Sequence, residues 1–65
     1  MKRVKLLGGA CDGLSLADEF GDELRMVQGF GGAFTPWRDA AGPPMIYHEI
    51  YLRSVRSRDK FVWQP

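Results

Sequence analysis

A chain of 65 residues is long enough for one small domain, which buries only about 60% of the surface that the unfolded chain exposes. Hydrophobic residues make up 45% and charged residues 26%, which excludes a fully disordered tail or a low-complexity linker. Nine basic and eight acidic side chains leave a net charge of +1, so no strong field steers the protein toward nucleic acid or a membrane. We therefore expect a single domain over residues 1–65.

Glycine and proline divide the chain into short apolar segments. Gly8, Gly9, Asp12 and Gly13 are typical of a tight turn, because glycine adopts positive φ and aspartate bonds to nearby backbone. The range 45–56 alternates between two sets of side chains and is rich in aromatic and β-branched residues, which indicates a strand. Strands are predicted at 2–8, 14–18, 23–28, 45–56 and 60–64.

The segment 15–27 allows a second interpretation. Apolar residues recur there at helical spacing: Leu16, Phe20, Leu24 and Val27. Ser15 and Asp18 resemble a capping box, whereas Gly21 in the interior costs a helix about 1 kcal/mol. The alternative fold is therefore α+β with a helix at about 15–27.

Residues 29–44 contain four glycines and three prolines, which indicates a long loop. Phe30, Phe34, Trp37 and Arg38 lie within nine positions of it and are of the types enriched at binding hot spots. They either fold back to cap a small core or present an apolar patch to a partner. We predict that this loop is the main contact surface and that these four residues are the partner-binding candidates.

The stretch 53–60 is the most basic part of the chain. Arg53, Arg56, Arg58 and Lys60 lie close in sequence to Tyr47 and Tyr51, and basic residues beside aromatic ones can contact phosphates and stack on bases. The alternative function is therefore weak nucleic-acid binding by this hairpin. The same arginines can also anchor a contact with a protein, and a hairpin whose charges are only solvated is the third interpretation.

Few side chains suit catalysis or metal binding. His48 is the only histidine, and its neighbour Glu49 points to the opposite face of a strand. Cys11 is the only cysteine, so no disulfide forms within the chain, and a turn or core position is expected for it. The acidic residues at 18, 19, 22 and 23 lack the spacing of a calcium loop. We predict no enzymatic activity, no metal and no cofactor.

The amino-terminal charges precede too few apolar residues for a signal peptide, and no apolar run approaches the roughly 18 residues of a membrane span. These observations predict a cytoplasmic protein with a reduced cysteine and no membrane partner.

The sequence Val-Lys-Leu-Leu-Gly-Gly-Ala-Cys-Asp-Gly at 4–13, with the Tyr-rich stretch 47–53 and the closing 61–63, resembles small, mostly uncharacterised proteins of actinobacterial tailed phages. Members open with a short strand and a Gly-Gly-Pro-x-Asp-Gly turn motif. Gly8, Gly9, Asp12 and Gly13 match that motif, and Ala10 replaces the proline, so the turn here is less rigid. The resemblance does not extend to 28–44. It implies a phage origin and a compact antiparallel β fold, and it carries no activity.

We therefore predict an all-β fold, a single small antiparallel meander or partly open barrel of four or five strands. The predicted core consists of Val4, Leu6, Leu14, Leu16, Leu24, Met26, Ile50, Leu52 and Val62. The predicted function is that of a non-enzymatic phage-type accessory protein that binds a protein, either a host factor in the host cytoplasm or a component of the virion. The oligomeric state stays open.

Overall fold

The computed structural model describes residues 2–29, 31–37 and 47–65, and all regular structure in these residues is β-strand. The strands are β1 (Arg3–Leu7), β2 (Ser15–Ala17), β3 (Glu23–Gln28), β4 (Phe34–Pro36), β5 (Tyr47–Arg53) and β6 (Lys60–Gln64). The prediction of an all-β fold is confirmed. The helix considered at 15–27 does not form, because β2 and β3 occupy its two ends and Gly21, at φ +68°, turns the chain between them.

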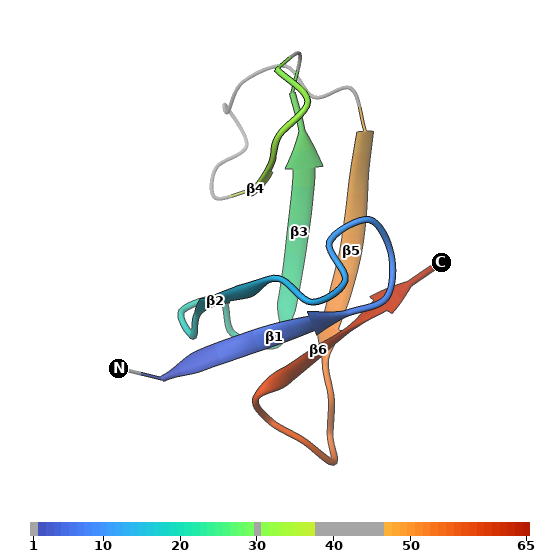
Figure 1. Ribbon diagram of the computed structural model, residues 1–65. Helices are drawn as coiled ribbons and strands as arrows, with labels where there is room; N and C mark the ends of the chain where they lie inside the picture. Colours follow the sequence, from blue (N-terminus) through green and yellow to red (C-terminus); the bar gives the residue numbers. More distant parts are fainter. Residues whose placement is uncertain (1, 30, 38–46) are drawn as a thin grey trace.

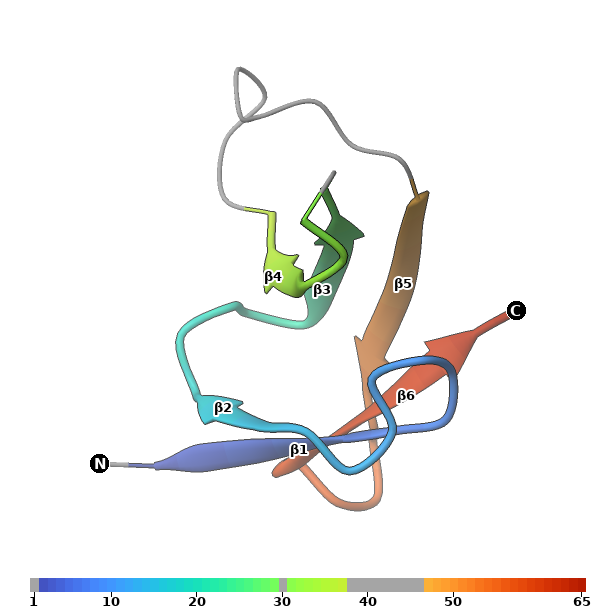
Figure 2. The ribbon, with the colours of Figure 1, turned by 45° about the horizontal axis from the view of Figure 1, so that its top comes forward.

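The six strands form one sheet in the order β2-β1-β6-β5-β3-β4 (Figure 1). Four of the five pairings are antiparallel, whereas β1 and β6 run parallel, so the two ends of the chain meet in the middle of the sheet. The prediction of a simple antiparallel meander is therefore wrong, because the first strand pairs in parallel with the last. The sheet twists and curves into a half-barrel whose two edge strands, β2 and β4, lie toward the same side in Figure 2.

The described residues form six strands rather than the four or five predicted, because β4 lies in the range predicted to be a loop. Its three residues pair with the end of β3, from Met26 to Gln28. The strand predicted at 45–56 is shorter, because β5 ends at Arg53; residues 45 and 46 lie outside the described residues.

The core confirms Val4, Leu6, Leu24 and Met26, each at most 2% exposed. The other predicted members differ. Leu14, Leu52 and Val62 are about 40% exposed, at 39%, 42% and 39%, whereas Leu16 and Ile50 are half-buried. The fully buried side chains of β5 and β6 are instead Tyr51 and Phe61, each 0% exposed. The prediction of which residues of β5 and β6 point inward was therefore wrong by one position, and a shift of one position moves every side chain to the opposite face of the sheet.

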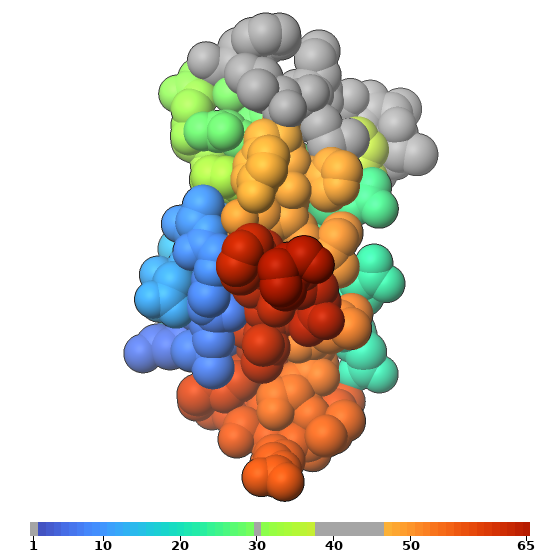
Figure 3. Space-filling model, turned by 90° about the vertical axis from the view of Figure 1, so that its right-hand side faces the viewer, coloured from blue at the N-terminus to red at the C-terminus, as the bar shows by residue number. Residues whose placement is uncertain are grey.

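The central strands lie side by side on the face shown in Figure 3, with β6 between β1 and β5. Leu7 of β1 lies opposite Val62 of β6, and Val62 lies opposite Leu52 of β5. These three partly exposed aliphatic residues thus form one row across the outer face of the sheet.

Each edge strand differs from an ordinary open edge on the side that faces away from the sheet. At β2, the Arg3 Nη2 donates to the Ser15 carbonyl at 2.9 Å and its Nε donates to the Ser15 hydroxyl at 2.9 Å. At β4, the Trp37 N–H that follows the strand points to the Arg25 carbonyl of β3. Because strand residues alternate in direction, the preceding Pro36 has its backbone nitrogen on the side away from β3.

Candidate functional site

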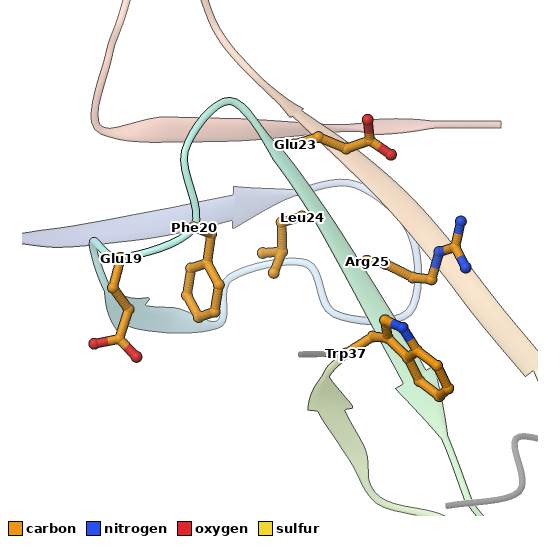
Figure 4. Close-up of a pocket in the computed structure, with 6 residues that line it drawn as sticks. All are labelled: Glu19, Phe20, Glu23, Leu24, Arg25 and Trp37. Carbon is orange, nitrogen blue, oxygen red and sulfur yellow. The ribbon is translucent and has the colours of Figure 1, made fainter. Parts of the chain in front are cut away.

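A surface hollow of about 250 Å³ lies beside β3, next to the end of β4 (Figure 4). Six residues line it: Glu19, Phe20, Glu23, Leu24, Arg25 and Trp37. Phe20 and Leu24 lie on one side of β3, and the side chains of Glu23 and Arg25 extend from the other side. The hollow therefore wraps around the edge of the strand and combines apolar walls with charged ones.

Contacts with the core hold the hollow in shape. Leu24 is 2% exposed in the core, and Phe20 packs against the same core from the β2–β3 connection. The Trp37 N–H donates to the Arg25 carbonyl at 2.7 Å, which fixes Trp37 beside β3. The Trp37 side chain stays half-buried, so part of the indole faces solvent.

The two charged residues contributed by β3 have no ion-pair partner among the residues that the structure describes. Glu23 is exposed and Arg25 is half-buried, and both lie on the outer face of the strand, opposite Leu52 and Ile50 of β5. Among residues 2–29, 31–37 and 47–65, neither side chain takes part in a hydrogen bond or an ion pair. Their charges are therefore available to a molecule that enters the hollow.

The four aromatic and arginine candidates separate in the structure. Trp37 lines the hollow, whereas Phe34 packs against the core and meets the Tyr47 ring edge-on, with centroids 6.1 Å apart and an interplanar angle of 84°. Phe34 thus caps the core, and Trp37 is the candidate that faces a hollow. Phe30 and Arg38 lie outside the described residues.

Arg53, one of the nucleic-acid candidates, is used inside the fold. Its side chain is only 9% exposed, and its guanidinium lies 4.7 Å from the centre of the Phe61 ring. Nη2 bonds to the Asp18 carboxylate at 2.6 Å and to the Gly21 carbonyl at 2.7 Å, and Nη1 donates to the Arg58 carbonyl. The guanidinium hydrogen bond lowers the pKa of Asp18 below its ordinary value. Arg53 therefore ties the β2–β3 and β5–β6 connections together.

The other basic candidates lie at the surface. Arg58 pairs with Asp22 at 2.7 Å, and Lys60 pairs with Asp59 at 3.0 Å. Arg56 is exposed in the turn, where its backbone N–H donates to the Ser54 hydroxyl at 3.2 Å. A second hollow of about 300 Å³ beside this hairpin has mixed charge; it is lined by Lys2, Arg3, Asp18, Arg53, Arg58 and Asp59.

The predicted turn residues form the connection between β1 and β2. Gly8, Gly9 and Gly13 have φ values of +87°, +67° and +87°, and the Asp12 carboxylate accepts the Gly8 N–H at 2.7 Å. The turn folds over Glu49, which is 5% exposed.

Hydrogen bonds join this turn to β5 through Glu49 and the two tyrosines beside it. The Glu49 carboxylate accepts the Ala10 N–H at 2.9 Å and the hydroxyls of Tyr47 and Tyr51 at 2.9 and 3.1 Å. The Tyr51 hydroxyl also lies 2.8 Å from the Gly8 carbonyl. The buried carboxylate is therefore fully satisfied, which is the arrangement of a structural network.

Cys11 and His48, the side chains best suited by type to catalysis or metal binding, are poorly placed for either role. Cys11 is buried, and this burial, followed by the nearby Glu49 charge, raises the pKa of its thiol, so the reactive thiolate is disfavoured. His48 is exposed on β5, on the face opposite Glu49. Within the described ranges, no group of three or more histidine, cysteine or acidic side chains is arranged to hold a metal ion.

Sequence reasoning found Trp37 but missed its neighbours Phe20, Glu23 and Arg25. The alternation of β3 places Glu23 and Arg25 on one face, so this part was available from the strand pattern. That Trp37 lies beside them depends on the pairing of β4 with β3, and no local pattern marked β4 as a strand.

Searches against protein-family models, curated proteins and solved structures found no match to this chain. No helix among the described residues is long and apolar enough to cross a membrane.

Proposed function

We propose that this chain is a non-enzymatic protein-binding module, and that the hollow beside β3 receives a side chain from its partner. The observation that carries the proposal is a concave surface lined by the half-buried Trp37 and by Glu23 and Arg25, two charges that have no ion pair within the described part of the chain. Tryptophan and arginine are enriched among the residues that dominate binding energies. A volume of about 250 Å³ is below the roughly 300–1,000 Å³ of small-molecule pockets and suits one anchoring side chain.

The distribution of paired and unpaired charges supports a protein partner over nucleic acid. Arg53, Arg58 and Lys60 each have an acidic partner within the chain, so a phosphate would compete with an existing ion pair. Weak nucleic-acid binding through residues 53–60 therefore has less support and serves as the alternative. From the resemblance to actinobacterial phage proteins noted in the sequence, we further propose that the partner is a host factor or a virion component.

Capture of partners by matched variants tests this function. The wild type, Trp37→Ala and Leu7→Ala are immobilised and exposed to an actinobacterial lysate at low and physiological salt. Leu7 is a suitable control because it is 37% exposed on β1, away from the hollow. We expect the wild type and Leu7→Ala to retain the same proteins and Trp37→Ala to lose them, with little dependence on salt, whereas nucleic-acid binding falls steeply as salt rises.

A thermal melt of each variant separates loss of binding from loss of folding. If Trp37→Ala does not fold, the indole N–H signals of Trp37 and Trp63 in the intact protein decide the question, because only the Trp37 signal should shift when the captured partner is added. A folded Trp37→Ala protein that captures the partner undiminished contradicts the proposal. So does a partner that leaves the Trp37 signal unmoved.

A further inference from the structure

The second hollow, beside the β5–β6 hairpin, lies at the end of the sheet where β1 and β6 begin and β2 and β5 end. Every residue that lines it carries a charge: Lys2, Arg3, Asp18, Arg53, Arg58 and Asp59. Its volume of about 300 Å³ is at the lower limit of small-molecule pockets, and an apolar occupant would take these charges out of water. The occupant that suits this hollow is therefore small and charged.

The charges in and around the second hollow do not cancel. Three ion pairs account for its carboxylates and for two of its arginines: Asp18 with Arg53 at 2.6 Å, Asp59 with Lys60 at 3.0 Å, and Asp22 with Arg58 at 2.7 Å. Lys2 and Arg3 have no ion pair among the residues that the structure describes. When the partners Asp22 and Lys60 are counted with the lining residues, the balance is two positive charges. The occupant favoured by this balance is an anion.

Lys2 and Arg3 also offer hydrogen-bond donors that the fold does not use. Arg3 is held through Nε and Nη2, which donate to the Ser15 hydroxyl and carbonyl at 2.9 Å each, and its Nη1 makes no hydrogen bond with the described residues. The Lys2 carbonyl accepts the Asp18 N–H at 3.0 Å, which fixes the start of β1 beside the hollow. The exposed Lys2 ammonium makes no hydrogen bond within the same ranges and supplies three donors. An anion thus gains donors without breaking an ion pair.

We infer that the second hollow binds a small ligand that carries a phosphate monoester group. A monoester has close to two negative charges above its second pKa of about 6, which matches the excess of two positive charges, whereas a phosphodiester has only one. Its terminal oxygens accept charge-assisted hydrogen bonds of the kind that Lys2 and Arg3 offer. This site is separate from the hollow beside β3, and the inference goes beyond the proposed function without resting on it.

Three small anions serve as probes: methyl phosphate, dimethyl phosphate and sulfate. Each is titrated into the full chain, up to millimolar concentrations and at constant ionic strength, while the backbone amide signals of the lining residues are followed by NMR. We expect saturable shifts with methyl phosphate at about pH 7 and binding weaker by about three-fold or more with dimethyl phosphate, which lacks the second charge.

The pH dependence tests the charge of the ligand. Methyl phosphate should bind about three-fold or more weakly at about pH 5, where it carries one charge, whereas sulfate keeps two charges and should bind equally at both values. The protein side of the contact stays constant, because no histidine lines the hollow. Hydrogen bonds from Arg53 and Lys60 lower the pKa values of Asp18 and Asp59, so both carboxylates remain ionised throughout.

Charge variants locate the site. Lys2→Gln should weaken the binding of methyl phosphate by roughly two- to five-fold, the size of exposed ion-pair effects. Lys5→Gln is the matched control, because it removes an exposed lysine of β1 that does not line the hollow and changes the net charge equally; it should have little effect. Asp59→Asn removes a lining carboxylate and should strengthen binding by a similar factor of about two to five. The amide signals of each variant report whether it is folded.

Four results would overturn the inference. They are the absence of saturable shifts with methyl phosphate, equal binding of methyl and dimethyl phosphate, a pH dependence as large for sulfate as for methyl phosphate, and equal weakening by Lys2→Gln and Lys5→Gln. Equal binding of the two phosphates would support the nucleic-acid alternative instead, because the nucleic-acid backbone is a phosphodiester. None of these results bears on the capture of a partner through Trp37, so the two proposals can fail separately.

Discussion

Replacing Gly9 by alanine should destabilise the fold more than the same change at Gly13. Both glycines have positive φ, +67° and +87°, in the connection between β1 and β2. At Gly13 an added Cβ meets no atom within 4 Å. At Gly9 it would lie 2.7 Å from the Tyr51 hydroxyl, 2.8 Å from Glu49 Oε1 and 3.0 Å from the Trp63 ring. The pair of variants therefore separates backbone strain from crowding.

The two contributions can be given magnitudes. Left-handed backbone costs a residue with a Cβ about 1–2 kcal/mol, and this is the full expected effect of Gly13→Ala. Overpacking a buried site costs about 1–3 kcal/mol more, so Gly9→Ala should lose about 2–5 kcal/mol. A single small core rarely supplies more than about 3–5 kcal/mol, so Gly9→Ala should be at the limit of folding.

Urea unfolding followed by tryptophan fluorescence measures both variants on one scale. We expect a lowered midpoint with an unchanged slope for Gly13→Ala and a largely unfolded population in the absence of urea for Gly9→Ala. Equal losses for the two variants would refute the reasoning, because the contacts around Gly9 would then contribute nothing.

Three further predictions concern buried and paired groups. Glu49→Gln places amide hydrogens against the Ala10 N–H or a tyrosine hydroxyl and should cost about 1–3 kcal/mol in urea unfolding; unchanged stability would contradict the network. Arg53 lowers the pKa of Asp18 below 3.8, so the pair stabilises the fold fully above that pH and less as the pH falls through the lowered value. The stability difference between wild type and Asp18→Asn should therefore shrink below about pH 4, and a constant difference would argue against the pair. Cys11 should react with a thiol reagent far more slowly in the native protein than in urea, and equal rates would contradict its burial.

Local patterns predicted the positions of most strands. The ranges 23–28 and 60–64 agree with β3 and β6, because each is bounded by turn residues and contains an apolar alternation. Alternation alone predicted the wrong inward face for β5, because Ile50 and Leu52 on one side are more apolar than Glu49, Tyr51 and Arg53 on the other. The polar side faces inward because distant parts of the chain satisfy it: the β1–β2 turn satisfies Glu49, and Asp18 satisfies Arg53.

The candidate site was predictable only in part. Trp37 was marked by its residue type within a loop rich in glycine and proline, and that signal is local. The hollow itself arises where three segments meet, and the pairing of β4 with β3 that brings them together depends on the whole sheet. The parallel pairing of β1 with β6 is likewise a long-range feature that no local pattern announces.

The contacts at the two edge strands affect what happens when many copies of this protein are close together. An open sheet ends in unpaired backbone groups that can recruit a strand from a neighbouring molecule and begin aggregation. At β2, a recruited strand would have to displace the Arg3 guanidinium from the Ser15 carbonyl. At β4, it would meet Pro36, which has no N–H to donate. Edge-to-edge growth into fibrils is thus opposed at both ends of the sheet, by the Arg3 guanidinium at β2 and by the missing N–H of Pro36 at β4.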